Sequence, residues 1–289
     1  MIERAHIPVL VKEVLDYLIS EKFSLFIDAT VGGGGHAFSI LGHHSKIKLI
    51  GLDVDEAGLA IAARRLQPFG ERVRLIRGNF RDLKDILARE GIDGFDAILF
   101  DLGLSMYHLQ GKRGFSFYDD SFLDMRMDNQ QEKTAFDVVN RYSTERLENI
   151  LLQYGEEYRA RAIAKAILYA RKKKPITTAL ELSSLILRVK GKKGRTHPAT
   201  KAFQAIRIEV NRELENIVSG LRDAIEMCRP GGRIGVISFH SLEDRIIKNT
   251  FRADERIKVI TKKPLKPSMK EIKENPASRS AKLRVAEKI

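Results

Sequence analysis

The sequence predicts an α/β protein in which a doubly wound parallel sheet is interrupted by an all-helical insertion. Short apolar runs that end in acids alternate with helical patterns as far as residue 101, and this alternation resumes after residue 207. In between, the apolar period is helical and no strand intervenes. We therefore expect a sheet domain formed by residues 1–112 and 207–289, and a helical domain formed by residues 113–206.

The stretch from residue 25 to residue 37 is the centre of this organisation. An apolar run ends at Asp28, four consecutive glycines follow at positions 32–35, and a helix-compatible segment comes next. A strand, a glycine loop and a helix in this order place bare main chain where a nucleotide-like ligand can bind. A flexible turn explains the four glycines alone equally well, so the neighbouring runs decide the interpretation.

Three later apolar runs also lead to polar or aromatic residues. These are residues 47–53, 73–80 and 95–101, which end at Asp53, Phe80 and Asp101. The carboxyl ends of parallel strands lie at one edge of a sheet, so we expect these three side chains and Asp28 to share one rim. An acid at the end of the second strand, such as Asp53, commonly binds the hydroxyls of a cofactor ribose.

The remaining elements follow from local signals. An amphipathic helix is predicted over residues 11–18, and Thr178 with Glu181 forms a capping box at the start of another helix. One long helix is expected from Pro198 to Ile225, followed by a turn at residues 229–232 and a strand at residues 234–239. The aromatic residues and methionines of the irregular segment from residue 103 to residue 128 are expected to serve mainly local packing.

Composition excludes several classes of protein. The 289 residues are 43% hydrophobic and 31% charged, and no apolar run approaches the roughly 20 residues of a membrane helix. Cys228 is the only cysteine, so intramolecular disulfides are excluded and a cytoplasmic location is the natural expectation. The seven histidines show no zinc-like spacing, and we expect no metal.

Positive charge is concentrated in two segments. The net charge is +13, and residues 159–201 contain thirteen Lys and Arg against one acid, Glu181. Residues 262–288 contain nine Lys and Arg against three acids. A single basic run usually forms a solvated helix face. Two such clusters on an otherwise slightly acidic chain favour a polyanionic partner, such as RNA.

The glycine loop fits two cofactors. Gly32, Gly34 and Ala37 match the G-x-G-x-x-A spacing of nicotinamide dinucleotide sites, although a lone match of this kind is weak. Three other stretches resemble motifs of the class I methyltransferases, which have a Rossmann-like sheet and bind S-adenosylmethionine. These stretches are residues 28–34, 78–80 and 230–232. We therefore expect S-adenosylmethionine as the cofactor.

Longer motifs distributed along the whole chain resemble one family, the RsmH (MraW) family. They are residues 6–10, 34–36, 101–103, 113–117, 124–128, 197–200, 237–245 and 275–284. The resemblance implies an enzyme that methylates the exocyclic N4 of one cytidine in small-subunit ribosomal RNA, near the decoding centre. Its partner would be that RNA or the small ribosomal subunit. The alternatives are a nicotinamide-dependent oxidoreductase and a non-catalytic RNA-binding protein of ribosome assembly.

The resemblance also implies a set of site residues. The family's cofactor contacts correspond to Gly34, Gly35, His36, Asp53, Phe80 and Asp101. At the next contact position His108 stands where the family has a glutamine. Spacing alone explains His36 equally well as a helix cap.

Two residues are candidates for chemistry on the substrate. A carboxylate that accepts a hydrogen bond from the cytosine amino group would favour attack by its nitrogen, and we assign Asp101 this catalytic role. A purely local role, fixing its own loop or the cofactor, is an equal alternative for Asp101. His240, at a predicted strand end, is the next candidate, and a structural role for it is at least as well supported.

Overall fold

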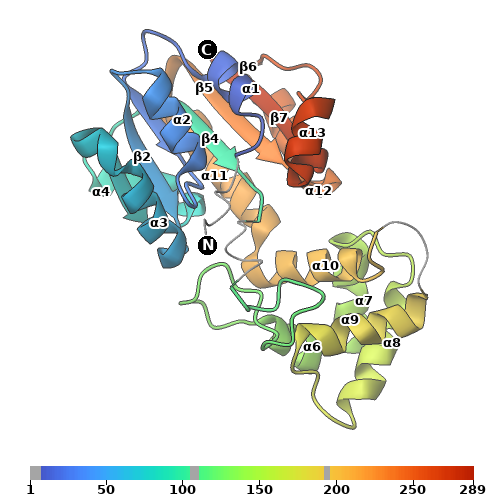
Figure 1. Cartoon of the computed structure of the whole chain (residues 1–289). Helices are drawn as coiled ribbons and strands as arrows, with labels where there is room; N and C mark the ends of the chain where they lie inside the picture. Colours follow the sequence, from blue (N-terminus) through green and yellow to red (C-terminus); the bar gives the residue numbers. More distant parts are fainter. Residues whose placement is uncertain (1–7, 105–110, 192–195) are drawn as a thin grey trace. The chain divides into compact units, whose positions relative to one another are not determined.

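The fold was analysed in a computed structural model, which describes residues 8–104, 111–191 and 196–289. The chain divides into two compact units, one formed by residues 1–103 and 214–289 and the other by residues 104–213. Figure 1 shows the sheet of the first unit and the helices of the second. No helix in the described ranges is both long and apolar enough to cross a membrane.

The first unit is built around a sheet. In the residues that the structure describes, this sheet has seven strands in the order β3-β2-β1-β4-β5-β7-β6. The strands are β1 (Leu25–Asp28), β2 (Lys48–Asp53), β3 (Val73–Arg77), β4 (Phe95–Asp101), β5 (Cys228–Ser238), β6 (Ile257–Val259) and β7 (Lys282–Lys288). The first five run parallel, whereas β7 is antiparallel to both β5 and β6. The predicted Rossmann-like sheet is therefore confirmed.

Helices and 3₁₀ turns follow the strands of this unit. They are α1 (Val11–Leu18), α2 (Gly35–His43), α3 (Glu56–Leu66), η1 (Gln67–Arg72), η2 (Phe80–Asp82), α4 (Leu83–Arg89), α11 (Glu213–Met227), α12 (Ser241–Ala253), α13 (Met269–Glu274) and η3 (Pro276–Ser280). The helix predicted over residues 11–18 is confirmed by α1.

Side chains alternate across the sheet and build one apolar layer on each face. In β1, Phe26 packs into the layer that contains α1, α2 and α3, and its neighbour Ile27 packs into the layer of α4, α11 and α12. Because successive strand residues point to opposite faces, a strand buried on both faces must be apolar throughout. This requirement explains the apolar runs of β1 and β2 and of residues 97–100 in β4.

The second unit is helical and has its own core. Its helices are α6 (Ala135–Arg141), α7 (Thr144–Gln153), α8 (Ala160–Arg171), α9 (Ala179–Lys190) and α10 (Thr200–Asn211). Capping boxes at Thr134 and Thr178 open α6 and α9, and the second confirms the predicted pairing with Glu181. Phe115 and Met125 of the preceding irregular segment are buried in this core, as their packing interpretation predicts.

Two sequence predictions need correction. The single helix expected from Pro198 to Ile225 is two helices, because Arg212 between α10 and α11 adopts a left-handed conformation with φ of 52°. A left-handed residue cannot continue a right-handed helix. The turn expected at residues 229–232 lies inside β5, whose pairing with β4 shifts register near its start.

Close packing of α1 on the sheet yields a stability prediction. A Cβ at position 235 of β5, where the chain has Gly235, would overlap Cδ1 of the buried Leu18. We expect Gly235→Ala to lower the free energy of unfolding by about 1–3 kcal/mol through overpacking, measured by urea denaturation. Gly42→Ala is the control, because nothing lies within 4 Å of its Cβ and alanine favours the helix. Equal stability of the two variants would contradict this account.

Candidate active site

Three aspartates end neighbouring parallel strands in the sheet unit. Asp28 ends β1, Asp53 ends β2 and Asp101 ends β4, and β1 lies between the other two strands. The structure therefore places these acids on one rim at the carboxyl edge of the sheet, where α/β proteins of this topology bind ligands.

Local hydrogen bonds fix the glycine loop against this rim. The Val31 amide donates to the carbonyl of Leu52 at 2.8 Å, and the Gly34 amide donates to the carbonyl of Val31 at 2.7 Å. Gly32 and Gly34 have φ values of 48° and 77°, which are readily accessible only to glycine. Gly34 is the N-cap of α2 and Gly35 its first residue, so the loop ends at a helix N-terminus.

Asp53 joins the second strand to the glycine loop. Its Oδ2 accepts a hydrogen bond from the Gly32 amide at 2.8 Å, and its Oδ1 accepts one from the Asp55 amide at 2.9 Å. These donors hold the carboxylate in a fixed orientation at the end of β2. A carboxylate at this position suits the vicinal hydroxyls of a ribose.

Asp28 is the most deeply buried of the three acids, with 1% of its surface exposed. Burial, reinforced by the nearby charges of Asp101 and Asp53, raises its pKa to about 8, although the Thr30 amide donates to its Oδ1. Asp28 is therefore mostly protonated at neutral pH. The rim then carries fewer negative charges than its three carboxyl groups suggest.

His36 connects the glycine loop to Asp101. Its ring is buried, with Nε2 2.8 Å from the carbonyl of Val9 and Nδ1 3.5 Å from Oδ2 of Asp101. A carbonyl oxygen only accepts hydrogen bonds, so the Nε2–H group of His36 donates a hydrogen bond to the carbonyl of Val9. Gly34, and not His36, caps α2, so the capping interpretation of His36 is wrong.

Asp101 has further anchors on its own strand and on β1. Its amide donates to the hydroxyl of Thr30 at 2.7 Å, and its Oδ1 accepts from the Gly103 amide at 3.4 Å. Its side chain is 16% exposed. Asp101 thus combines a fixed backbone, a histidine neighbour and partial access to solvent, which suit a group that exchanges protons with a ligand.

Phe80 begins η2, directly after β3. Asn79 caps this turn through the Arg81 amide, and the Gly78 amide donates to the carbonyl of Asp53 at 2.9 Å. The Phe80 ring packs edge-on against Phe100, with 5.4 Å between the ring centroids, and remains partly exposed. A half-buried ring beside the Asp53 strand can offer its open side to an adenine base. His108 lies outside the described residues.

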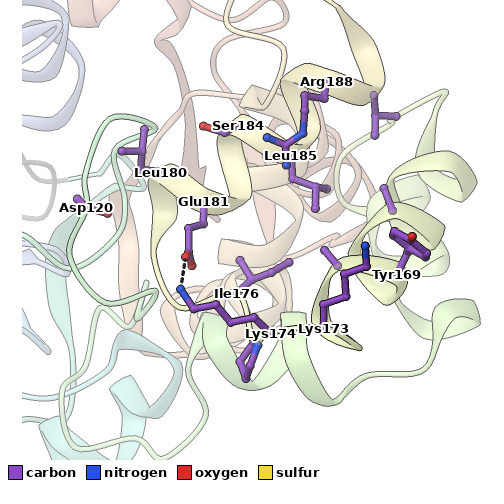
Figure 2. Close-up of a pocket in the computed structure, with 14 residues that line it drawn as sticks. Asp120, Tyr169, Lys173, Lys174, Ile176, Leu180, Glu181, Ser184, Leu185 and Arg188 are labelled. Carbon is purple, nitrogen blue, oxygen red and sulfur yellow. Dashed lines mark hydrogen bonds and ion pairs between the residues drawn. The ribbon is translucent and has the colours of Figure 1, made fainter.

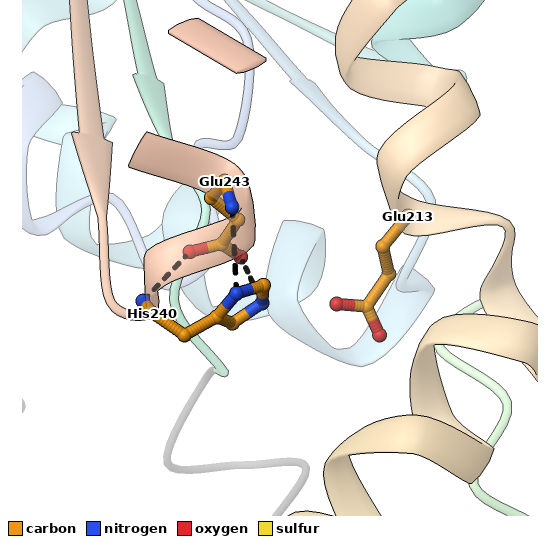
Figure 3. A group of neighbouring side chains, drawn as sticks. All are labelled: Glu213, His240 and Glu243. Atoms are coloured by element: carbon orange, nitrogen blue, oxygen red, sulfur yellow. Dashed lines mark hydrogen bonds and ion pairs between the residues drawn. The ribbon is translucent and has the colours of Figure 1, made fainter. Parts of the chain in front are cut away.

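His240 has a structural role in the sheet unit. It is the N-cap of α12, and its Nδ1 accepts from the Glu243 amide at 3.4 Å, while its Nε2 lies 3.0 Å from Oε1 of Glu243 (Figure 3). The buried Glu243 also accepts from the amides of Phe239 and His240, at 2.7 and 3.2 Å. The two residues form a capping box through Nδ1 of His240 and the Glu243 carboxylate.

Sequence reasoning missed two contacts that connect the site. It placed His36 and Asp101 separately and did not predict their pairing. It also did not assign a role to Thr30, although a threonine two residues after Asp28 is a polar side chain next to the rim. The order of the strands could have predicted these contacts. Because β1 and β4 are neighbours, the residues that follow β1 lie beside the end of β4.

The fold and the rim together define a class of protein, an α/β enzyme that binds a nucleotide-like cofactor at the carboxyl ends of its strands. Comparison with known proteins narrows this class. The model of the MraW methylase family matches residues 3–289, and the chain belongs to this family. The family prediction made from the motifs is therefore confirmed.

Curated relatives are similar over nearly their whole length. The "Ribosomal RNA small subunit methyltransferase H" of Persephonella marina is 52% identical over 290 residues, covering 98% of this chain and 99% of that protein. Proteins of the same name from Sulfurihydrogenibium sp. and Carboxydothermus hydrogenoformans are 50% and 47% identical, covering 98% and 99% of this chain and 99% of each relative.

The buried acid predicts a characteristic dependence of stability on pH. In the unfolded chain the pKa of Asp28 has the usual aspartate value of 3.8, whereas in the folded chain it is about 8. Between these values the folded state alone binds this proton. The contribution of Asp28 to the free energy of unfolding therefore falls by up to about 1.4 kcal/mol per pH unit as the pH rises from 4 to 8, and it is constant above that range.

We expect Asp28→Asn to remove this dependence, because the amide resembles the protonated acid and does not titrate. Urea denaturation between pH 4 and pH 9 should show the variant gaining stability relative to the parent as the pH rises. Asp16→Asn is the control, since Asp16 lies on the surface beside Lys12. If the curves of Asp28→Asn and the parent run parallel, Asp28 is ionised in the folded protein.

Proposed function

We propose that this protein transfers a methyl group from S-adenosylmethionine to the exocyclic N4 of a cytidine in small-subunit ribosomal RNA. The observation that carries the proposal is the family match across residues 3–289, together with relatives about 50% identical that are named for methylation of this RNA. A methylase family also favours S-adenosylmethionine over a nicotinamide cofactor. The N4 specificity is our extension: the resemblance of the sequence motifs implies it, and a carboxylate at the rim suits its chemistry.

The residues of the rim fit the proposed cofactor. The loop at Gly34 and Gly35 carries main chain without side chains to the start of α2, Asp53 presents a fixed carboxylate for ribose hydroxyls, and Phe80 is a partly exposed ring for adenine. When bound, S-adenosylmethionine supplies an electrophilic methyl group on a sulfonium. Residues 1–112 and 207–289 would form this cofactor domain, and residues 113–206 would recognise the substrate.

Asp101 is the proposed proton acceptor. The lone pair of a cytosine amino group is delocalised into the ring, which makes the nitrogen a weak nucleophile. A carboxylate that accepts one amino hydrogen would help the nitrogen to pyramidalise and to attack the methyl group that the bound cofactor would supply, with the thioether as the leaving group. The methylated nitrogen would then lose a proton to Asp101, whose Oδ2 lies 3.5 Å from Nδ1 of His36.

Cys228 is unsuited to the alternative chemistry of carbon methylation. Attack through C5 of a pyrimidine generally needs a cysteine thiolate that first adds to the ring. Cys228 is buried at the start of β5, and burial raises the pKa of its thiol to about 12. Its side chain is therefore an uncharged, packed group at neutral pH.

The reaction can be tested with the purified protein, methyl-labelled S-adenosylmethionine and unmodified small-subunit RNA or small subunits. We expect N4-methylcytidine after nucleoside digestion and mass spectrometry, and the same product from Cys228→Ser and Cys228→Ala. Calorimetry should show binding of S-adenosylmethionine and not of NAD. A C5-methylated product would contradict the N4 assignment. Cofactor binding without RNA methylation of either substrate would favour a non-catalytic RNA-binding protein.

The role of Asp101 can be separated from cofactor binding. We expect Asp101→Asn to lower single-turnover methyl transfer by roughly 10²-fold or more while the cofactor's Kd changes little, because the amide retains shape but is a poor proton acceptor. The matched variant Asp53→Asn should show the opposite pattern, a higher Kd with normal transfer from bound cofactor. A raised Kd with normal transfer in Asp101→Asn would make Asp101 a binding residue.

A further inference from the structure

A groove on the helical unit lies outside the site described above. It has a volume of about 700 Å³ and is formed by the end of α8, the turn that follows it and one side of α9 (Figure 2). Ile176 and Leu185, both nearly buried, are part of its apolar lining. A cavity of this size matches sites for small organic ligands, such as one or two nucleotides.

Cations of the basic segment, residues 159–201, divide into two groups in the structure. One group stabilises the helical unit: the Arg171 guanidinium donates to the carbonyls of Val139 and Tyr142, at 2.7 and 2.6 Å, and Lys190 pairs with the buried Glu157. The other group is exposed, and its members Lys173 and Arg188 line the groove. The sequence could not distinguish these groups.

Acids at the groove do not cancel this charge. Glu181 accepts from the Thr177 amide at 2.7 Å and pairs with Lys174 at 3.1 Å, so its charge serves the cap of α9 and one lysine. Asp120 is the other acid of the lining. Lys173 and Arg188 form a cationic edge of the groove, and Lys172 precedes Lys173 in the sequence. This edge complements phosphates.

Tyr169 supplies an aromatic surface at the groove. Its side chain is 65% exposed, and Lys173 Nζ lies 4.7 Å from the centroid of its ring. Figure 2 shows the two side chains next to each other. An exposed aromatic ring adds no packing energy to the core. Beside cations and apolar side chains, such a ring can stack with a nucleic-acid base.

We propose that this groove binds a single-stranded segment of the RNA substrate, with one base stacked on Tyr169 over the apolar lining and the flanking phosphates bound by Lys173 and Arg188. The inference rests on the proposed function, because it takes ribosomal RNA as the substrate. The combination of an aromatic face, an apolar lining and a cationic edge is typical of single-strand binding, since a base in a duplex has no free face for stacking.

Binding measurements test the stacked base. Fluorescence anisotropy with a labelled single-stranded fragment of small-subunit RNA should show about tenfold weaker binding for Tyr169→Ala and near-normal binding for Tyr169→Phe, which keeps the ring. The control is Tyr17→Ala, since Tyr17 is a surface tyrosine, 36% exposed, in the sheet unit. The same fragment carrying 4-thiouridine should crosslink on irradiation to a peptide that contains Tyr169.

The cationic edge is tested separately. The double variant Lys173→Ala, Arg188→Ala should reduce the slope of log affinity against log salt by about 1.4 for single-stranded RNA, as expected for two lost phosphate contacts. Circular dichroism identifies any variant that fails to fold. Unchanged affinity in Tyr169→Ala and an unchanged salt slope in the double variant would each overturn the assignment.

Methylation assays distinguish failure of this inference from failure of the proposed function. If the parent protein methylates the RNA, Tyr169→Ala should raise the KM for RNA several-fold with little change in kcat. A normal KM in that variant would refute the groove as an RNA site and leave the methyltransferase assignment intact. If the groove binds a protein, RNA crosslinks will be absent at Tyr169, and the inference fails in the same way.

Discussion

Asp28 sets the main electrostatic constraint on the candidate site, because it is an almost fully buried acid between two strands that also end in acids. The parallel pairing of β1 with β2 and β4 brings the three side chains to the same edge. Three ionised carboxylates there would repel one another in a poorly hydrated environment. The raised pKa of Asp28 relieves this repulsion, since the protonated group carries no charge.

Hydrogen bonds accommodate the other two acids. Asp53 is satisfied by the amides of Gly32 and Asp55, and Asp101 by the Gly103 amide and the contact with His36. Each of these partners belongs to the loop that follows a strand, or to α2. The glycine loop therefore connects two parts of the site: it leads from β1 to the N-terminus of α2, and its amide at Gly32 stabilises an acid of the rim.

Features that depend on residues close together in the sequence, such as strands and helix caps, could be predicted from the sequence. Short apolar runs identified the strands that end at Asp28, Asp53 and Asp101, because a strand covered on both faces must be largely apolar. The capping box at Thr178 was also predictable, since its two partners lie three residues apart. Local spacing is sufficient for such features.

Contacts that depend on three-dimensional proximity could not be predicted in the same way. The pairing of His36 with Asp101 joins residues 65 positions apart, and the pKa of Asp28 depends on burial that no local pattern reports. Arg212 breaks the expected helix although arginine is a good helix former, so tertiary packing overrides local propensity there. His240 caps α12 although histidine is not a preferred capping residue.

Charge is divided between the two units in a way that constrains how RNA could be used. The rim of the sheet unit is acidic, and a phosphate backbone gains nothing by approaching Asp53 and Asp101. Affinity for a polyanion must therefore come from cations elsewhere, and the exposed Lys173 and Arg188 of the helical unit are suited to it. Part of the other basic segment is already neutralised, since Lys282 and Arg284 both pair with Asp244, at 3.3 and 2.6 Å.

On the proposed function, only the uncharged base needs to reach the acidic rim, and the rim itself need not bind phosphates. A base can do so when it is splayed out of its stack, which single-stranded RNA permits at low energetic cost. The acids then contribute selectivity as well as chemistry. A carboxylate accepts a hydrogen bond from the amino group of cytosine, whereas the carbonyl at the same ring position of uracil would face it with repulsion. The rim thereby favours the base that has a nitrogen to methylate.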